Sequence, residues 1–135
     1  MATSNFDWSE YLALARELAN RSDEASLRSA LSRIYYFVYH LAMDRANSNG
    51  FALFPGEAAH KQLWRNFIES PDPECRSLGL IAGRLKEKRE RADYNIIYPR
   101  LADEMMVTIS EAEKFADRLS KLPLRLPRPI QSGSR

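Results

Sequence analysis

The stretch that decides the fold spans residues 27–42 and reads LRSALSRIYYFVYHLA. Its apolar side chains recur at intervals of three and four residues, which is the spacing of one face of an α-helix. Further aromatic residues at positions 36, 37 and 39 extend the apolar surface around the other side of this helix. A helix that is apolar over most of its circumference lies at the centre of a bundle or against a partner. We therefore predict a central helix over residues 23–46, with Ser22 as its N-cap.

The same spacing predicts four more helices around the central one. They are expected at residues 5–20, with Ser4 as N-cap, and at residues 57–69, 74–97 and 100–122. Consecutive helices joined by short connections pack in an antiparallel manner. The sequence therefore predicts an all-α fold, an antiparallel up-and-down helical bundle of four to five helices, over residues 1–122. Residues 123–135 contain prolines and arginines but no acidic residue, and we expect them to form a flexible tail.

Composition points to a cytoplasmic protein of one domain. The chain has 135 residues, and its single cysteine, Cys75, cannot form an intrachain disulfide, which favours a reducing compartment. We see no secretory signal and no apolar run long enough to cross a membrane, so no membrane contact is expected.

The net charge of +2 is distributed unevenly along the sequence. Arg125, Arg128 and Arg135 supply three positive charges in a segment without acidic residues, so the rest of the chain carries about −1. The domain as a whole therefore lacks the charge of a basic nucleic-acid binder, and any site for a polyanion must be a local cluster.

Arg33 and His40 are the first candidates for chemistry. They lie seven positions apart on the predicted central helix, and seven helical steps of about 100° return almost to the starting direction. Both side chains therefore share one face, with Tyr36 between them. Arginine binds phosphate oxygens through parallel hydrogen bonds and histidine moves protons near neutral pH, so the pair suits phosphodiester cleavage. The alternative is an arginine paired with a carboxylate and a histidine that belongs to the core.

A second candidate site lies further along the chain, in a run of charged residues. Arg89 and Asp93 are four positions apart and face the same side of the predicted helix. Arg84, Lys88 and Arg91 form a positive stripe that could contact RNA phosphates. The alternative is a solvated helix face stabilised by ion pairs.

No metal or cofactor site is predicted. His40, His60 and Cys75 lack the close spacing of a zinc site. The sequence contains no glycine-rich phosphate loop and no serine or cysteine in a nucleophile elbow.

Two segments together resemble one branch of the HEPN superfamily of helical proteins. Residues 32–42, SRIYYFVYHLA, resemble its SRxYYxxxHxA signature, and residues 89–94, RERADY, resemble its RxxADY motif. His60 with Phe67 resembles a weaker pattern between them. The two stronger matches occur in the expected order, and the likeness covers about residues 23–119.

The resemblance implies a helical bundle that is often a symmetric dimer, and many such proteins are metal-independent ribonucleases of toxin–antitoxin or phage-defence systems. It makes Arg33 and His40 the catalytic pair, acting on an RNA substrate. The usual family motif, R-x4–6-H, lies on a late helix, whereas the fit in this chain lies on the second helix. The alternative is a non-catalytic module that binds a nucleotidyltransferase antitoxin or a nucleotide.

Two further expectations concern packing. The motif residues Tyr36, Arg89, Asp93 and Tyr94 are expected to form a supporting network, with Arg33 close to Asp93 or Tyr94. The aromatic surface of the central helix exceeds the needs of one bundle face, so we also predict a two-fold homodimer that buries it.

Overall fold

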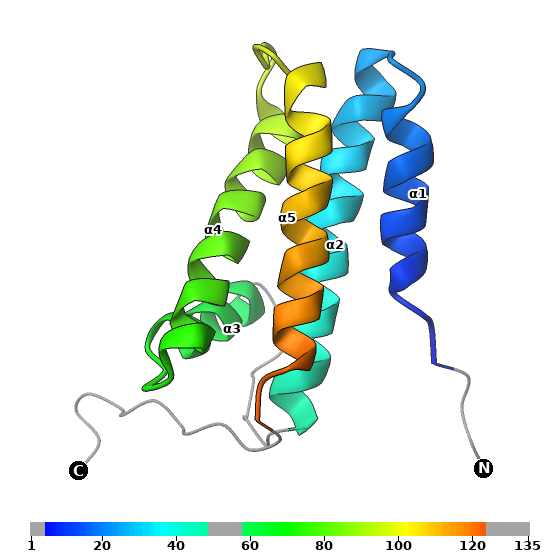
Figure 1. The fold of residues 1–135 in the computed structure, drawn as a ribbon. Helices are drawn as coiled ribbons and strands as arrows, with labels where there is room; N and C mark the ends of the chain where they lie inside the picture. Colours follow the sequence, from blue (N-terminus) through cyan, green and yellow to red (C-terminus); the bar gives the residue numbers. More distant parts are fainter. Residues whose placement is uncertain (1–4, 49–57, 124–135) are drawn as a thin grey trace.

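The computed structural model describes residues 5–48 and 58–123, and within these ranges the regular structure is entirely helical. Its elements are α1 (Ser9–Ala19), α2 (Glu24–Ser48), α3 (Ala58–Ile68), α4 (Pro73–Tyr94), the 3₁₀ turn η1 (Ala102–Glu104) and α5 (Met105–Ser120) (Figure 1). The predicted all-α fold class is confirmed. The predicted flexible tail lies, apart from its first residue, outside the described residues.

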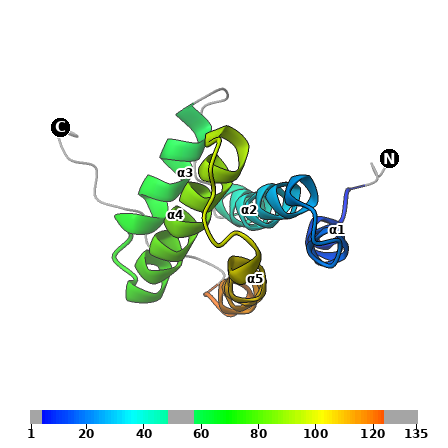
Figure 2. The ribbon, with the colours of Figure 1, turned by 90° about the horizontal axis from the view of Figure 1, so that it is seen from above.

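The long helices run up and down along one another. In Figure 1, α1 ascends, α2 descends, α4 ascends and α5 descends, so consecutive long helices are antiparallel. α2 lies in the middle and contacts α1, α4 and α5 (Figure 2). Its residues Leu31, Ile34 and Tyr35 are almost completely buried. The helix with the widest apolar surface therefore forms the centre of the core, as its sequence predicts.

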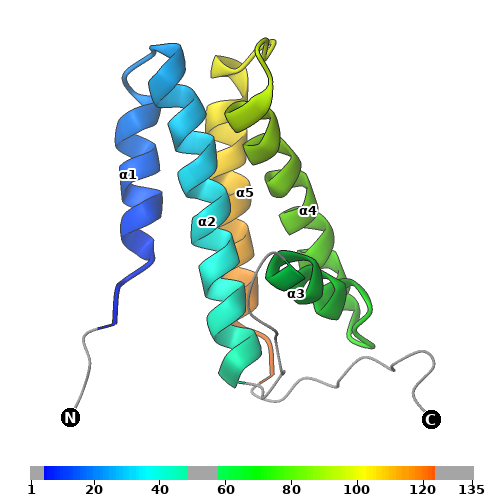
Figure 3. The same cartoon turned by 180° about the vertical axis from the view of Figure 1, so that it is seen from behind.

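The short helix α3 lies outside this antiparallel set. It packs beside the N-terminal half of α4, at the lower end of the bundle in Figure 3. Gly79 permits this close approach, because a Cβ atom at that position would lie 2.8 Å from Ile68 Cγ1 and 3.2 Å from the Ile68 backbone nitrogen. A residue without a side chain thus sets the separation of the two helices.

Two arginines of α2 bind the C-terminal ends of other helices. Arg28 donates hydrogen bonds to three backbone carbonyls where α4 ends, those of Ala92, Asn95 and Ile96. Arg45 does the same where α5 ends, at the carbonyls of Leu119, Leu122 and Pro123. A helix leaves its last carbonyls without intrahelical partners, and a guanidinium group supplies donors for them. α2 therefore helps to determine where both helices stop.

The connection between α4 and α5 differs from the prediction. α4 ends at Tyr94 instead of residue 97, and Ile96 is 94% exposed. The backbone turns away because Asn95 is extended and Arg28 takes the carbonyls that follow. Arg100 then adopts a left-handed conformation with φ of 60°, so α5 begins at Met105 and not at residue 100.

The predicted N-caps are also corrected. Ser22 has a left-handed backbone with φ of 70°, and the cap of α2 is Asp23, whose carboxylate accepts from the Ser26 N–H at 3.0 Å. α1 begins at Ser9 instead of residue 5, and the Asp7 carboxylate accepts from the backbone N–H and the hydroxyl of Ser9. The position of the predicted cap Ser4 lies outside the described residues.

The aromatic surface from which a homodimer was predicted is already buried within one chain. Phe37 and Tyr39, which were expected to be surplus, are 4% and 9% exposed, and only Tyr36 of the three is half-buried. The homodimer stays a prediction, but this surface no longer supports it. None of the described helices is long and apolar enough to cross a membrane.

Candidate functional site

Arg33, Tyr36 and His40 lie along one face of α2, as their spacing predicts. The Arg33 guanidinium lies over two aromatic rings, 4.5 Å from the ring centre of Tyr11 on α1 and 5.5 Å from that of Tyr36. Arg33 and His40 are both half-buried. Among the described residues Arg33 forms no ion pair, so its charge is not neutralised by a carboxylate there.

His40 is held by aromatic neighbours. Its ring stacks on Trp8, with centroids 3.5 Å apart and planes inclined by only 4°. Burial lowers the pKa of His40 below its usual 6.5, and the nearby Arg33 charge lowers it further, whereas Asp44 acts in the opposite direction. His40 is therefore mainly neutral at pH 7 and able to accept a proton.

His60, from α3, joins this site through a chain of hydrogen bonds. The Trp64 indole N–H donates to the Tyr35 hydroxyl at 2.9 Å, and the same hydroxyl lies 2.7 Å from His60 Nδ1. Since an indole nitrogen can only donate, the Tyr35 hydroxyl is free to donate its own proton to His60 Nδ1. With the Tyr35 hydroxyl as the donor, the proton of the neutral His60 ring is assigned to Nε2.

Tyr39 connects the two histidines. Its ring centre lies 4.0 Å from that of His60, in a stacked arrangement, and 5.2 Å from that of His40. Burial lowers the pKa of His60, and the positive charges of Lys86 and Arg89 and the presence of His40 lower it further. The site thus holds two imidazoles on either side of one tyrosine, both mainly neutral at pH 7.

Arg89, from α4, adds a second guanidinium. It lies 5.4 Å from the ring centre of Tyr36 and 5.8 Å from that of Tyr94. Its Nε is 3.0 Å from an Asp93 oxygen, but the direction is poor and this buried Nε makes no hydrogen bond among the described residues. We therefore regard the contact with Asp93 as an electrostatic pair only.

The predicted network is assembled with a different connectivity. Arg33 contacts Tyr11 and Tyr36, whereas Asp93 and Tyr94 contact Arg89. The two arginines both approach the ring of Tyr36. We call the aromatic, histidine and arginine side chains that contact one another at this site the ring cluster. Its members are Trp8, Tyr11, Arg33, Tyr36, Tyr39, His40, His60 and Arg89.

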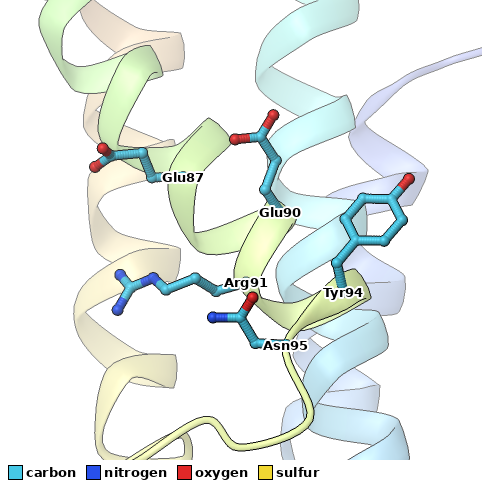
Figure 4. A pocket seen from close by; sticks show the side chains of 5 residues that line it. All are labelled: Glu87, Glu90, Arg91, Tyr94 and Asn95. Carbon is cyan, nitrogen blue, oxygen red and sulfur yellow. The ribbon is translucent and has the colours of Figure 1, made fainter.

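The residues of the predicted positive stripe lie elsewhere. Lys88 donates to Thr108 at 2.9 Å and pairs with Glu111 of α5, which also lies 3.5 Å from Arg84. Arg91 lies over the ring of Tyr98. In Figure 4, Arg91 extends from α4 toward the side of α5, whereas Glu90 and Tyr94 extend toward the side of α2. The structure thus separates Arg84, Lys88 and Arg91 from the ring cluster.

Several members of the ring cluster were not predicted as site residues from the sequence. His60 was considered for a zinc site and in the weaker part of the resemblance, and Trp8 and Tyr11 were not singled out. The signal that could have pointed to His60 was Tyr35, which lies in the apolar stripe of the central helix. A buried tyrosine hydroxyl requires a hydrogen-bond partner from another part of the chain. No group of three or more metal-ligating side chains occurs in the described ranges 5–48 and 58–123.

The ring cluster combines two proton-carrying groups with two permanent positive charges. Such a set can hold an anion between the guanidinium groups and move a proton beside it. No family model, curated protein or solved structure matches the chain. The chemistry of the site therefore has to be argued from its own residues.

Proposed function

We propose that the chain is a HEPN-type ribonuclease that cleaves RNA without a metal ion, in the cytoplasm, as the effector of a toxin–antitoxin or phage-defence system. One observation carries the proposal: two imidazoles and two guanidinium groups gather around the half-buried ring of Tyr36. The ring centres of His40 and His60 lie 6.3 and 6.0 Å from that of Tyr36, and Arg33 and Arg89 lie 5.5 and 5.4 Å from it. The resemblance of residues 32–42 and 89–94 to two motifs of the HEPN superfamily supports the proposed role in a toxin–antitoxin or phage-defence system.

Each part of the ring cluster has a role in the proposed reaction. Arg33 holds the scissile phosphate through its planar, paired donors, and Arg89 adds a second positive charge next to the ring of Tyr36. His60 donates from Nε2 to a phosphate oxygen, because its Nδ1 faces Tyr35. His40, neutral at pH 7, accepts the proton of the neighbouring 2′-hydroxyl.

The bond changes then follow from these positions. The 2′-oxygen attacks phosphorus as it loses its proton to His40, and the bond from phosphorus to the 5′-oxygen breaks. The proton passes from His40 to the departing 5′-oxygen. The products are a 2′,3′-cyclic phosphate and a 5′-hydroxyl, and His40 returns to its neutral form.

The experiment is cleavage of single-stranded RNA in the presence of EDTA. The expected products carry cyclic phosphate ends, and His40→Ala lowers the rate by roughly 10²–10⁴, the usual contribution of a general acid or base. Arg33→Lys also loses activity, because an ammonium group cannot reproduce the planar fork. Arg84→Ala, on the opposite side of α4, is the matched control and retains the wild-type rate.

All variants must keep the wild-type helicity and thermal midpoint for this comparison to count. Intact RNA at high protein concentration would contradict the proposal. Cleavage that continues unchanged in His40→Ala would show that the wrong residues were assigned.

A second candidate function is a non-catalytic module that binds a protein partner, such as a nucleotidyltransferase. It is favoured by exposed apolar residues around the connection of α4 to α5, where Ile96, Ile97 and Met106 are 94%, 75% and 82% exposed. Exposed apolar surface of this kind marks interaction sites. An inactive wild-type protein that binds such a partner, and loses it in Ile97→Lys, would establish this function instead.

A further inference from the structure

A groove lies between α3 and α4, next to the ring cluster. Its volume of about 430 Å³ is within the range of sites for small molecules. Its apolar lining comes from Trp64 and Ile68 of α3 and from Gly79 and Gly83 of α4. Charged side chains of both helices, and of the residue that follows α3, complete it: Lys61, Arg65, Glu69, Lys86, Glu87 and Glu90.

The packing of α4 does not require a glycine at position 83. A Cβ built at Gly83 meets no heavy atom within 4 Å among the described residues, whereas a Cβ at Gly79 would collide with Ile68. A glycine inside a helix is less stable than alanine by about 1 kcal/mol. The wall of the groove at Gly83 is therefore kept flat and open although the helix would be more stable with a side chain there.

The groove is continuous with the ring cluster through His60. This residue lines the groove and also stacks on Tyr39, 4.0 Å away. Lys86 and Glu90, which line the groove as well, are close enough to shift the pKa of His60 in opposite directions. A ligand whose phosphate lies at Arg33 and His40 can therefore extend past His60 into the groove.

We infer that the groove is a base-binding subsite that takes the nucleobase adjoining the phosphate at the ring cluster; this inference rests on the proposed function. The lining contains three cationic and three anionic side chains, so it has no net charge to attract a second phosphate. A nucleobase is a neutral ring with flat apolar faces and a polar edge. Its faces suit the apolar wall formed by Ile68, which is 43% exposed, and by the bare backbone at Gly83.

The polar edge of the base has partners along α4. Glu87 and Glu90 of α4 both line the groove. Figure 4 shows that their side chains leave the helix in different directions, so each carboxylate would meet a different part of the ligand. A carboxylate accepts hydrogen bonds from exocyclic amino groups, and Lys61 and Lys86 donate to ring acceptors. Bases with an exocyclic amino group are therefore preferred to uracil.

The test is nuclear magnetic resonance of the full chain with guanosine 3′-monophosphate, uridine 3′-monophosphate and inorganic phosphate as probes. The guanosine nucleotide is expected to shift the Gly83 amide and the Trp64 indole signals, and to bind more tightly than the uridine nucleotide. Inorganic phosphate leaves both signals in place. Gly83→Leu fills the groove and weakens binding of the guanosine nucleotide at least tenfold. Arg84→Leu is the control, because this neighbouring residue of α4 pairs with Glu111 of α5 and does not line the groove, and it binds within twofold of wild type.

Two results would overturn the subsite: an absence of nucleotide-induced shifts at Gly83 and Trp64, or wild-type affinity in Gly83→Leu. The variant must retain native helicity, which leucine in a helix favours. RNA cleavage separates the two proposals. If wild type cleaves RNA and Gly83→Leu cleaves it equally well, the subsite is wrong and the function stands. If the nucleotide binds in the groove but RNA is never cleaved, the proposed function is wrong and the subsite stands.

Discussion

At the scale of single residues, the Tyr35 hydroxyl decides how His60 presents its proton. This hydroxyl is completely buried, accepts from Trp64 and lies 2.7 Å from His60 Nδ1. Removing it leaves the buried indole N–H without its acceptor, and an unsatisfied buried donor costs about 1–3 kcal/mol.

We therefore expect Tyr35→Phe to lower the free energy of unfolding by about 1–3 kcal/mol. The pKa of His60 should rise in this variant, because the hydrogen bond that favours its neutral form is lost. Urea unfolding and titration of the His60 ring by nuclear magnetic resonance measure the two effects. Tyr36→Phe is the matched control on the same helix, and equal effects in both variants would contradict the assigned role of Tyr35.

The two histidines also make stability depend on pH. Burial lowers the pKa of both below 6.5 in the folded protein, so the unfolded chain binds protons more readily than the folded one. Their contribution is fully present above about pH 6.5 and decreases as the pH falls below it. The pKa of Glu74 is lowered from 4.5 by its hydrogen bond to Arg118, so this residue changes the free energy of unfolding only at lower pH.

The free energy of unfolding is therefore expected to fall between pH 7.5 and 5.5. A variant with both His40→Gln and His60→Gln should show a smaller fall across this interval. Denaturant unfolding at the two pH values is the measurement. A dependence on pH that is the same with and without the histidines would show that other groups cause it.

At the scale of elements, two glycines of α4 face α3 with different consequences. Gly79 touches Ile68, so alanine at this position forces the helices apart, and overpacking of this kind typically costs about 1–3 kcal/mol. Gly83 faces open space, so alanine there adds helix propensity of up to about 1 kcal/mol without a collision.

Gly79→Ala is therefore expected to destabilise the protein and Gly83→Ala to stabilise it. The two variants have the same change in composition, on the same helix and the same face, so they serve as controls for each other. Thermal unfolding followed by circular dichroism gives the sign of each effect. Stabilisation by both substitutions would mean that α3 does not pack closely against α4.

The elements also show what the sequence could and could not predict. The spacing of apolar residues was sufficient to locate the helices and to place Arg33 and His40 on one face, because both depend on one helix alone. It missed the end of α4, since the carbonyls there are taken by Arg28, which is more than 60 positions earlier in the chain. It missed the contribution of His60 for the same reason, because the partner Tyr35 lies on another helix.

At the scale of the whole molecule, the homodimer predicted from the sequence needs a different surface. Phe37 and Tyr39 are used inside the chain, whereas Ile96, Ile97 and Met106 remain exposed. If two copies associate through these residues, light scattering at micromolar concentration will give twice the chain mass. Ile97→Lys should then give a monomer with unchanged helicity, since the side chain is 75% exposed. If light scattering gives the mass of one chain for the wild-type protein, the dimer prediction is wrong.

The position of α3 outside the antiparallel helices has a consequence for how the site is regulated. His60 meets Tyr39 only while α3 is docked, and undocking would uncover Leu63 and Phe67 and release the Tyr35 hydroxyl from His60 and Trp64. Such a sub-global opening needs less free energy than complete unfolding, so the amide hydrogens of α3 should exchange with solvent before those of α2. A nucleotide that spans α3 and α4 would slow that exchange. Its binding would thereby raise the fraction of molecules in which the two imidazoles face each other, and the substrate would assemble the site that acts on it.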